Sequence, residues 1–313
     1  MKREMNNIKV VSTGKYVPQK ILTNYDLEKI VETSDEWIYT RTGIKSRHIS
    51  TTETTADLAY FAAKAAIEKV NYDINNIDLI IVATCSAELK TPSVANIVQA
   101  KLGLNDKDIP CFDISAACTG FVYALDVASQ MINRGGFKGA LVIGAETLST
   151  HTDFTDRNTC ILFGDGAGAM IIENTEAVKP AYFYTASMGV LDNVLTVKDK
   201  IAMEGRKVYT FATKAMESSV NKILNDCNLT PDDIDKIIPH QANIRIIETA
   251  SKALNIGMDK FFVNIEHYGN TSSASVIIAL DEYLETLDSR DNKKIIFVAF
   301  GGGFTWGATL LTL

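Results

Sequence analysis

One cysteine of this chain occupies a position where a thiol could act as a nucleophile. Cys118 lies in FDISAACTGFVYALD, between a run typical of a strand and a segment with helical spacing. The small residues Ala116, Ala117 and Gly120 leave room around its sulfur. Because the dipole and free N–H groups at a helix start stabilise negative charge, we expect a lowered pKa for this thiol. The position therefore predicts a covalent nucleophile.

The other cysteines are better explained as small apolar residues of the core. The chain holds five cysteines, an odd number, and contains no CxxC motif. This favours reduced thiols and a cytoplasmic location. The core cysteines are Cys85, Cys111, Cys160 and Cys227.

Two polar side chains follow strand-like runs in the C-terminal half. His240, in IIPHQANIRIIETASKAL, sits where a strand gives way to a helix. A lone histidine is more often structural than catalytic, but this is one of only four, and its place favours catalysis. His267 is a second candidate base. Asn270, in HYGNTSSASVIIALDEYL, could equally cap the next helix, and by itself the sequence favours the cap.

A glycine-rich loop follows the last long apolar run. In FGGGFTWG, Gly301 to Gly303 can bring backbone N–H groups close to a ligand. The alternative is a tight turn between two strands.

The elements that must position these residues come in two copies. Short β-branched runs alternate with helical patterns, which is typical of a layered α/β fold with largely parallel sheets. Matches in one order predict two copies of a supersecondary unit, packed as a pair. We place the halves at residues 1–173 and 174–313, with a joining segment from about 174 to 200. The matched segments are Ile74–Ser86 with Pro231–Asn243, Ile109–Ile114 with Phe261–Ile265, Gly139–Glu146 with Lys294–Gly301, and Phe163–Ile172 with Phe300–Leu311.

The composition excludes several classes of protein. A hydrophobic fraction of 46% with 22% charged residues is normal for a globular enzyme. The net charge of −7 argues against nucleic-acid binding. No apolar run approaches the roughly 20 residues that a membrane span needs. We therefore expect a cytoplasmic enzyme.

Six motifs in one order resemble the 3-oxoacyl-acyl-carrier-protein synthase III family, decarboxylating condensing enzymes of the thiolase fold. The resemblance runs from about Ile8 to Leu311 and implies duplicated α/β halves in a five-layer α-β-α-β-α core. It also implies a homodimer that uses acyl-CoA and malonyl-acyl-carrier-protein, with no cofactor and no metal. The motifs are TSDEWIYTRTGIKSRHI, AACTGF, TDRNTCILFGDGAGA, PHQANIRI, YGNTSSAS and FGGGFTWGA.

The resemblance also assigns roles to individual residues. It makes Cys118 the acyl-accepting nucleophile, with His240 and Asn270 as catalytic partners. The backbone N–H groups of Cys118 and Gly302 would hold the oxyanion. For the surface cations, a solvated charged face is the alternative. The remaining matches are Trp37, Arg41, Arg157 and Asn243 for coenzyme A, Thr91 and Phe300 for the acyl pocket, and Lys214, Arg245 and Lys252 for docking of the carrier protein.

The implied reaction is a decarboxylative Claisen condensation that initiates fatty-acid synthesis. Three departures from the family pattern leave the acyl group open: Thr91 replaces an aromatic residue, Thr119 replaces alanine or serine, and the stretch SMGVLDNVLTVKDKIAMEGRKVY is short. Thr91 and the short stretch favour an alternative, a specialised-metabolite enzyme of the same type that condenses or transfers an unusual acyl group, whereas Asn270 argues against pure acyl transfer.

Two further alternatives belong to other classes. A thioester hydrolase would use Cys118 and His240, but no carboxylate is evident beside the histidine. A carrier-protein scaffold without activity would be expected to lose Cys118, His240 or Asn270, and all three are present.

Overall fold

The computed structural model describes residues 5–190, 192 and 194–313, and its largest sheet has nine strands. The strand order is β11-β12-β13-β8-β1-β7-β6-β4-β5, so each half of the chain supplies one side of the sheet. In the described part of the chain, a short pairing of β1 with β8, at Asn6 and Asn7, joins the two sides. The strands are β1 (Asn6–Tyr16), β4 (Ile77–Ala83), β5 (Cys111–Ile114), β6 (Gly139–Glu146), β7 (Gly166–Asn174), β8 (Pro180–Ser187), β11 (Lys236–Pro239), β12 (Lys294–Gly301) and β13 (Thr305–Thr312).

The two sides of the sheet repeat one topology, which confirms the duplication. The order β4-β6-β7-β1 in the first half matches β11-β12-β13-β8 in the second. Phe261 bridges Ile237 in parallel and takes the place that β5 has beside β4. We propose that the halves are residues 1–173 and 174–313, a boundary at the end of β7.

The prediction of largely parallel sheets was wrong. Strand β7 is antiparallel to β6 and β1, and β13 is antiparallel to β12 and β8. The parallel pairs are β4 with β5, β4 with β6, and β11 with β12. Only residues 302–304 separate β12 from β13. A connection of this length reverses the chain and cannot make the crossover that a parallel pair needs.

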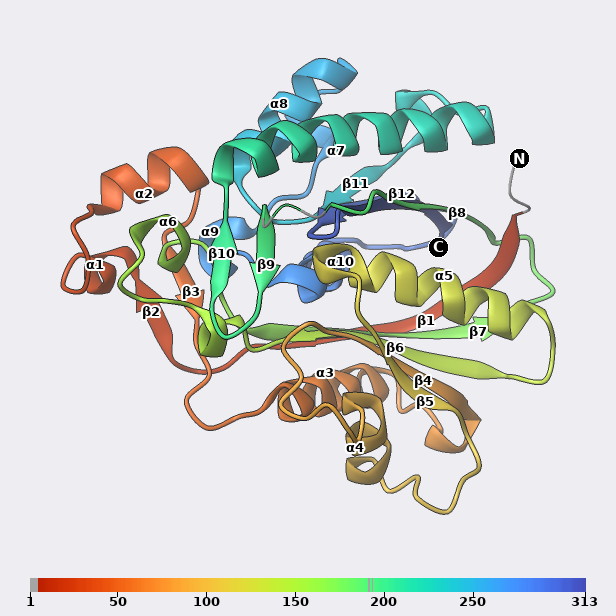
Figure 1. The fold of residues 1–313 in the computed structure, drawn as a ribbon. Helices are drawn as coiled ribbons and strands as arrows, with labels where there is room; N and C mark the ends of the chain where they lie inside the picture. Colours follow the sequence, from red (N-terminus) through yellow and green to blue (C-terminus); the bar gives the residue numbers. More distant parts are fainter. Residues whose placement is uncertain (1–4, 191, 193) are drawn as a thin grey trace.

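Helices cover and separate the two sides of the sheet, giving the five expected layers (Figure 1). Helices α3 and α4 cover the outer face of the first half, and α7 and α8 cover the outer face of the second. Helices α5 and α10 lie between the halves, and most of their residues are buried. These helices are α3 (Thr55–Lys69), α4 (Val94–Lys101), α5 (Gly120–Asn133), α7 (Gly205–Cys227), α8 (Ile244–Leu254) and α10 (Ser275–Glu285).

The two central helices begin differently from most of the outer ones. Outer helices α3, α4 and α8 have side-chain N-caps, from Thr54, Ser93 and Asn243, whereas α7 has none. Helices α5 and α10 have no side-chain cap and follow short 3-10 turns, η2 (Ala117–Thr119) and η6 (Ser272–Ala274). These two equivalent turns touch each other at the centre of the molecule.

Smaller elements surround this centre. The expected short stretch 187–209 contains a hairpin, although Leu191 and Asn193 lie outside the described residues. No helix in the described part of the chain is long and apolar enough to cross a membrane. The remaining elements are β2 (Ile21–Thr23), β3 (Ser46–His48), β9 (Leu195–Val197), β10 (Ile201–Met203), α1 (Asn24–Leu27), α2 (Asp35–Thr42), α6 (Arg157–Cys160), α9 (Ile265–Tyr268), η1 (Ile74–Asn76), η3 (Leu148–His151), η4 (Pro231–Asp233) and η5 (Met258–Lys260).

Candidate active site

Cys118 lies in η2, between the end of β5 and the start of α5, as the sequence predicts. Ala117 before it has a φ of +47°, in the left-handed region that non-glycine residues rarely adopt. The end of β12 passes so close that a Cβ on Gly301 would lie 2.7 Å from the Cys118 backbone nitrogen. Glycine at 301 therefore lets the loop after β12 approach the backbone of the nucleophile.

The expectation of a lowered thiol pKa was wrong. Burial raises the pKa of Cys118 to about 12, and the nearby Glu146 carboxylate adds to the rise. A hydrogen bond with the Ser272 side chain acts in the opposite direction and lowers this pKa. In the absence of substrate the sulfur is therefore a protonated thiol, because loss of hydration outweighs the helix dipole.

His240 follows directly after β11 and is 1% exposed. Its Nδ1 lies 2.7 Å from the Ser275 hydroxyl, and its ring packs edge-on against Phe300, with centroids 5.2 Å apart. Burial lowers the pKa of His240 to about 3, so the imidazole is neutral at physiological pH. Because Nδ1 is engaged with Ser275, Nε2 is the ring nitrogen left for a ligand.

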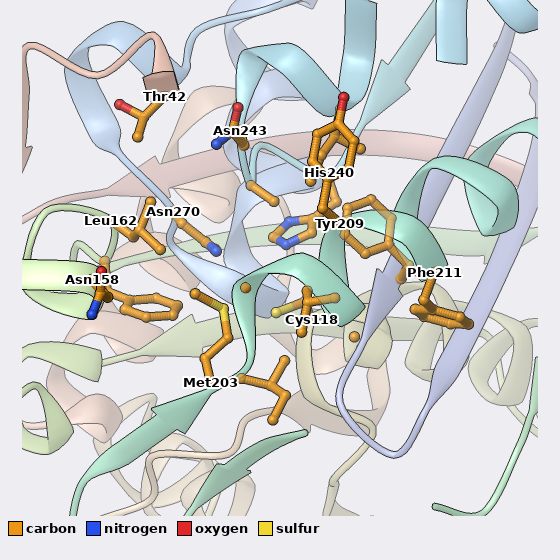
Figure 2. A pocket seen from close by; sticks show the side chains of 18 of the residues that line it. Thr42, Cys118, Asn158, Leu162, Met203, Tyr209, Phe211, His240, Asn243 and Asn270 are labelled. Carbon is orange, nitrogen blue, oxygen red and sulfur yellow. The ribbon is translucent and has the colours of Figure 1, made fainter. Parts of the chain in front are cut away.

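Asn270 is held by the turn that follows it. The Ser272 backbone N–H donates to Asn270 Oδ1 at 2.8 Å, which resembles the expected cap but acts on η6. With its oxygen engaged, the amide offers its Nδ2 donors to the surroundings. Figure 2 shows the side chains of Cys118, His240 and Asn270 directed into one cavity. His267, the other candidate base, is exposed and lies outside this cavity.

Two cavities meet at Cys118. The first, which we call the His240 cavity, has a volume of about 220 Å³ and extends from Cys118, His240 and Asn270 out to Arg41 and Asn243. The second, the Cys85 cavity, has a volume of about 400 Å³. Its apolar wall comes from η3 and the β9–β10 hairpin. The wall residues are Leu148, Leu195, Val197 and Ile201.

An aromatic ring with two guanidinium groups lies beside the outer end of the His240 cavity. The Arg41 and Arg157 guanidinium carbons lie 4.4 and 4.8 Å from the centroid of the Trp37 ring. Both arginines are exposed, and Arg157 Nη1 donates to the Glu32 carbonyl at 3.0 Å. Guanidinium groups pair with phosphate, and an indole face stacks on a purine. This group of residues suits an adenine nucleotide.

The remaining predicted site residues lie in the cavities or on the surface. Gly302 lines the Cys85 cavity, whereas Phe300 lines the His240 cavity, and Asn243 caps α8 through a bond from the Arg245 N–H. Thr91 is exposed and lines neither cavity of the single chain, so its acyl-pocket role stays a prediction. Thr119 is buried, and its hydroxyl donates to the Thr305 carbonyl. The predicted docking cations Lys214, Arg245 and Lys252 are exposed on α7 and α8.

Sequence reasoning missed two residues beside the nucleophile. Cys85 was expected in the core, but it lines a cavity together with Cys118. Glu146 is fully buried nearby and bonded to hydroxyl groups. The internal repeat could have drawn attention to Glu146. It aligns this residue with Gly301, which begins the glycine-rich loop predicted to lie near the ligand. Cys85 also packs against an apolar cluster, as do the other three predicted core cysteines.

Alkylation of Cys118 should accelerate with pH without a plateau below pH 10. The thiol pKa is about 12, so the thiolate fraction increases about tenfold for each pH unit below it. With a pKa of about 3, His240 adds no step near neutral pH. The rate of iodoacetamide adduct formation on Cys118, followed by mass spectrometry from pH 6 to 10, measures this. A plateau near pH 7 would contradict this, because it would show that the helix start lowers the thiol pKa more than burial raises it.

Known proteins match almost the entire chain. Residues 112–189 match the family described as 3-oxoacyl-[acyl-carrier-protein (ACP)] synthase III, and residues 224–313 match its C-terminal part. The chain is 53% identical to a β-ketoacyl-[acyl-carrier-protein] synthase III of Acholeplasma laidlawii over 98% of both chains. It is 50% identical to one of Clostridium acetobutylicum, over 98% of this chain and 99% of that protein. The crystal structure of 3-oxoacyl-[acyl-carrier-protein] synthase III from Aquifex aeolicus, 45% identical, superposes with a TM-score of 0.95 over 98% of this chain and 100% of that one.

A five-layer duplicated fold with a cysteine where two cavities meet defines an acyltransferase of the thiolase-like type. The chain belongs to the 3-oxoacyl-[acyl-carrier-protein] synthase III family, whose members initiate fatty-acid synthesis by Claisen condensation. These matches favour that function over the specialised-metabolite alternative. Among the described residues there is no cluster of side chains that could hold a metal ion.

Proposed function

We propose that this protein condenses an acyl-CoA with malonyl-acyl-carrier-protein through an acyl-cysteine on Cys118. The observation that carries the proposal is the convergence of Cys118, His240 and Asn270 on one cavity (Figure 2). A cysteine supplies a nucleophile, and the two nitrogen side chains supply hydrogen bonds to a developing oxyanion. No cofactor is needed for this chemistry, because coenzyme A is a substrate.

In the first stage the Cys118 sulfur attacks the thioester carbonyl and coenzyme A leaves. The thiol proton ends on the departing coenzyme A sulfur, so the step is balanced. The backbone N–H groups of Cys118 and Gly302 hold the oxyanion. The close approach of Gly301 to the Cys118 nitrogen supports this pairing, since it brings the two backbone segments together.

In the second stage malonyl-acyl-carrier-protein loses carbon dioxide and leaves a thioester enolate. The enolate oxygen accepts hydrogen bonds from His240 Nε2–H and Asn270 Nδ2–H. We assign the imidazole proton to Nε2 because Ser275 can accept from the Gln241 N–H while it donates to Nδ1. The enolate carbon then attacks the acyl-cysteine, and Cys118 takes up one proton as the 3-oxoacyl product leaves. Asn270 cannot act as a base on water, so the site favours condensation over hydrolysis.

The two cavities hold different parts of the substrate, on either side of the Cys118 sulfur. The pantetheine arm occupies the His240 cavity, with Asn243 along it and the nucleotide at Trp37, Arg41 and Arg157. The acyl chain then lies in the Cys85 cavity, whose apolar wall suits a hydrocarbon. Thr91 joins this acyl pocket from the other subunit of a homodimer, since it lies outside the cavity of its own chain. Phe300, the other predicted acyl-pocket residue, packs against His240 near the sulfur.

The carrier protein docks on the outer face of α7 and α8. Lys214, Arg245 and Lys252 are exposed there. An acidic carrier protein would contact these cations while its pantetheine arm reaches Cys118. Arg245 is held in place, because its Nε donates to the Thr40 carbonyl at 3.0 Å. We also propose a cytoplasmic location, which the free cysteines support.

Removing either guanidinium beside Trp37 should weaken binding of acyl-CoA. We expect Arg41→Ala and Arg157→Ala each to raise KM for acyl-CoA about tenfold and to leave kcat within about twofold, because they act on a part of the substrate that does not react. Steady-state kinetics with acyl-CoA and with an acyl-pantetheine lacking the nucleotide measure the effect. The shortened substrate should show no difference between variant and wild type. Arg134→Ala, an exposed arginine after α5, is the control.

The proposal is tested by incubating the protein with a panel of acyl-CoAs and weighing the intact protein. The expected result is one acyl adduct per chain, mapped to Cys118, with the fastest primer identifying the natural acyl group. An adduct elsewhere, or none with any primer, would overturn the assignment.

A further inference from the structure

Glu146, the last residue of β6, is a fully buried carboxylate beside the nucleophile. Its hydrogen-bond donors are hydroxyl and N–H groups and the Cys85 thiol, whose sulfur lies 3.5 Å from both oxygens. Oε2 accepts from Ser86 Oγ at 2.6 Å and from the Cys85 N–H at 3.1 Å, which holds the loop after β4. Oε1 accepts from Ser273 Oγ at 2.7 Å and from Ser272 Oγ at 3.1 Å, which holds η6. A buried carboxylate requires such donors, so this network is built around Glu146.

The turn that Glu146 holds is the one that orients Asn270. Ser272 has a φ of +49°, and its N–H fixes Asn270 Oδ1. A left-handed serine persists only when its surroundings enforce it. Hydrogen bonds to a carboxylate are roughly twice as strong as neutral ones, and here they hold both Ser272 and Ser273. Strand β6 also approaches η6 closely, since a Cβ on Gly144 would lie 2.6 Å from the Ser273 carbonyl oxygen.

Ser272 also lies beside Cys118, since both line the Cys85 cavity. A hydrogen bond from the Ser272 hydroxyl lowers the pKa of the thiol, whereas the Glu146 charge raises that pKa. Because this hydroxyl has one proton, Glu146 and the sulfur compete for it. The two residues therefore act on the nucleophile in opposite directions. The other titratable groups that face this cluster are Cys85 on the loop after β4, Asp165 before β7, and His240 after β11.

We propose that Glu146 is a positioning residue of the condensation, which acts through Ser272 on both Asn270 and Cys118. The inference rests on the proposed function, in which Asn270 donates to the enolate. In Glu146→Gln the amide oxygen must face the Cys85 N–H, a backbone donor that cannot reverse. The amide NH₂ then faces Ser272 and Ser273, so their bonds become neutral and change direction.

The test compares Glu146→Gln and Ser272→Ala with wild type in two measurements. We expect the rate of Cys118 alkylation at pH 8 to rise at least threefold in Glu146→Gln and to fall at least threefold in Ser272→Ala. Across pH 6 to 10 each profile should shift in parallel, to lower pH for Glu146→Gln and to higher pH for Ser272→Ala. We also expect the ratio of condensation to acylation to fall about tenfold in Glu146→Gln.

The matched control is Asp281→Asn. Asp281 is another buried carboxylate, 2% exposed, which accepts from Thr13 and Lys69 at 2.6 Å on the helix that follows η6. Its variant should keep the wild-type alkylation profile. Shifts of the same sign in both test variants, or an unchanged ratio in Glu146→Gln, would overturn the inference. Alkylation does not depend on condensation, so it tests the link between Glu146 and Cys118 by itself. If the wild type forms no 3-oxoacyl product, the proposed function is overturned instead.

Discussion

The Cys118→Ala variant should form no acyl adduct and should lose at least about 10⁴-fold in kcat for condensation. The acyl group must be carried by a thiol where the two cavities meet, and without it the reaction has no covalent intermediate. Among the described cysteines, Cys118 is the only one that lines both cavities. Intact-protein mass spectrometry and steady-state formation of 3-oxoacyl product measure the two losses.

Cys111→Ala is the matched control for this prediction. Cys111 packs against an apolar cluster and lines neither cavity. We expect this variant to be acylated on Cys118 at a rate within about threefold of wild type. The thiol nearest to the nucleophile is that of Cys85, which lines the same cavity, but burial and the Glu146 charge raise its pKa well above the ordinary value. Acylation of Cys85 in the Cys118→Ala protein would contradict the assignment of the nucleophile.

The Asn270→Ala variant should separate the two stages of the reaction. Loss of one oxyanion donor costs about 3 kcal/mol, or about 10²-fold in rate, and this donor serves only the enolate. We therefore expect condensation to fall by at least about 10²-fold, while acylation by acyl-CoA stays within about threefold. Single-turnover acylation and condensation from preformed acyl-enzyme give the two rates separately.

Asn270→Asp sharpens the same prediction. Aspartate retains the oxygen that accepts from the Ser272 N–H but has no amide donor for the enolate. It should lose condensation as Asn270→Ala does. The substitution removes the hydrogen-bond donor to the enolate but keeps the bond from Ser272 that holds the turn. If either variant loses acylation and condensation equally, the division of labour between Asn270 and Cys118 is wrong.

The catalytic residues could be predicted because each sits where a local pattern changes. Cys118 and His240 follow strands and precede helices, and the repeat indicates that such points from the two halves meet. The structure brings both into one cavity with Asn270. For Asn270, local sequence favoured a cap, and the observed bond to Ser272 shows that capping geometry and a free amide donor are compatible.

Properties that depend on long-range packing were not predicted. The direction of β7 relative to β6 depends on the connection between them rather than on the apolar runs, so the sheets were expected to be more parallel than they are. The pKa of Cys118 depends on burial by the opposite half, which a local helix start does not reveal. Glu146 joins the loop after β4 to a turn 127 residues further along the chain, at Ser273. Only the fold brings those groups together.

The most direct measurement starts from isolated acyl-enzyme and adds malonyl-acyl-carrier-protein. Our assignment predicts that the Cys118 adduct disappears with equal amounts of carbon dioxide and 3-oxoacyl carrier protein. An adduct that persists, or that is lost to water as the free acid, would contradict a condensing enzyme and indicate a transferase or hydrolase.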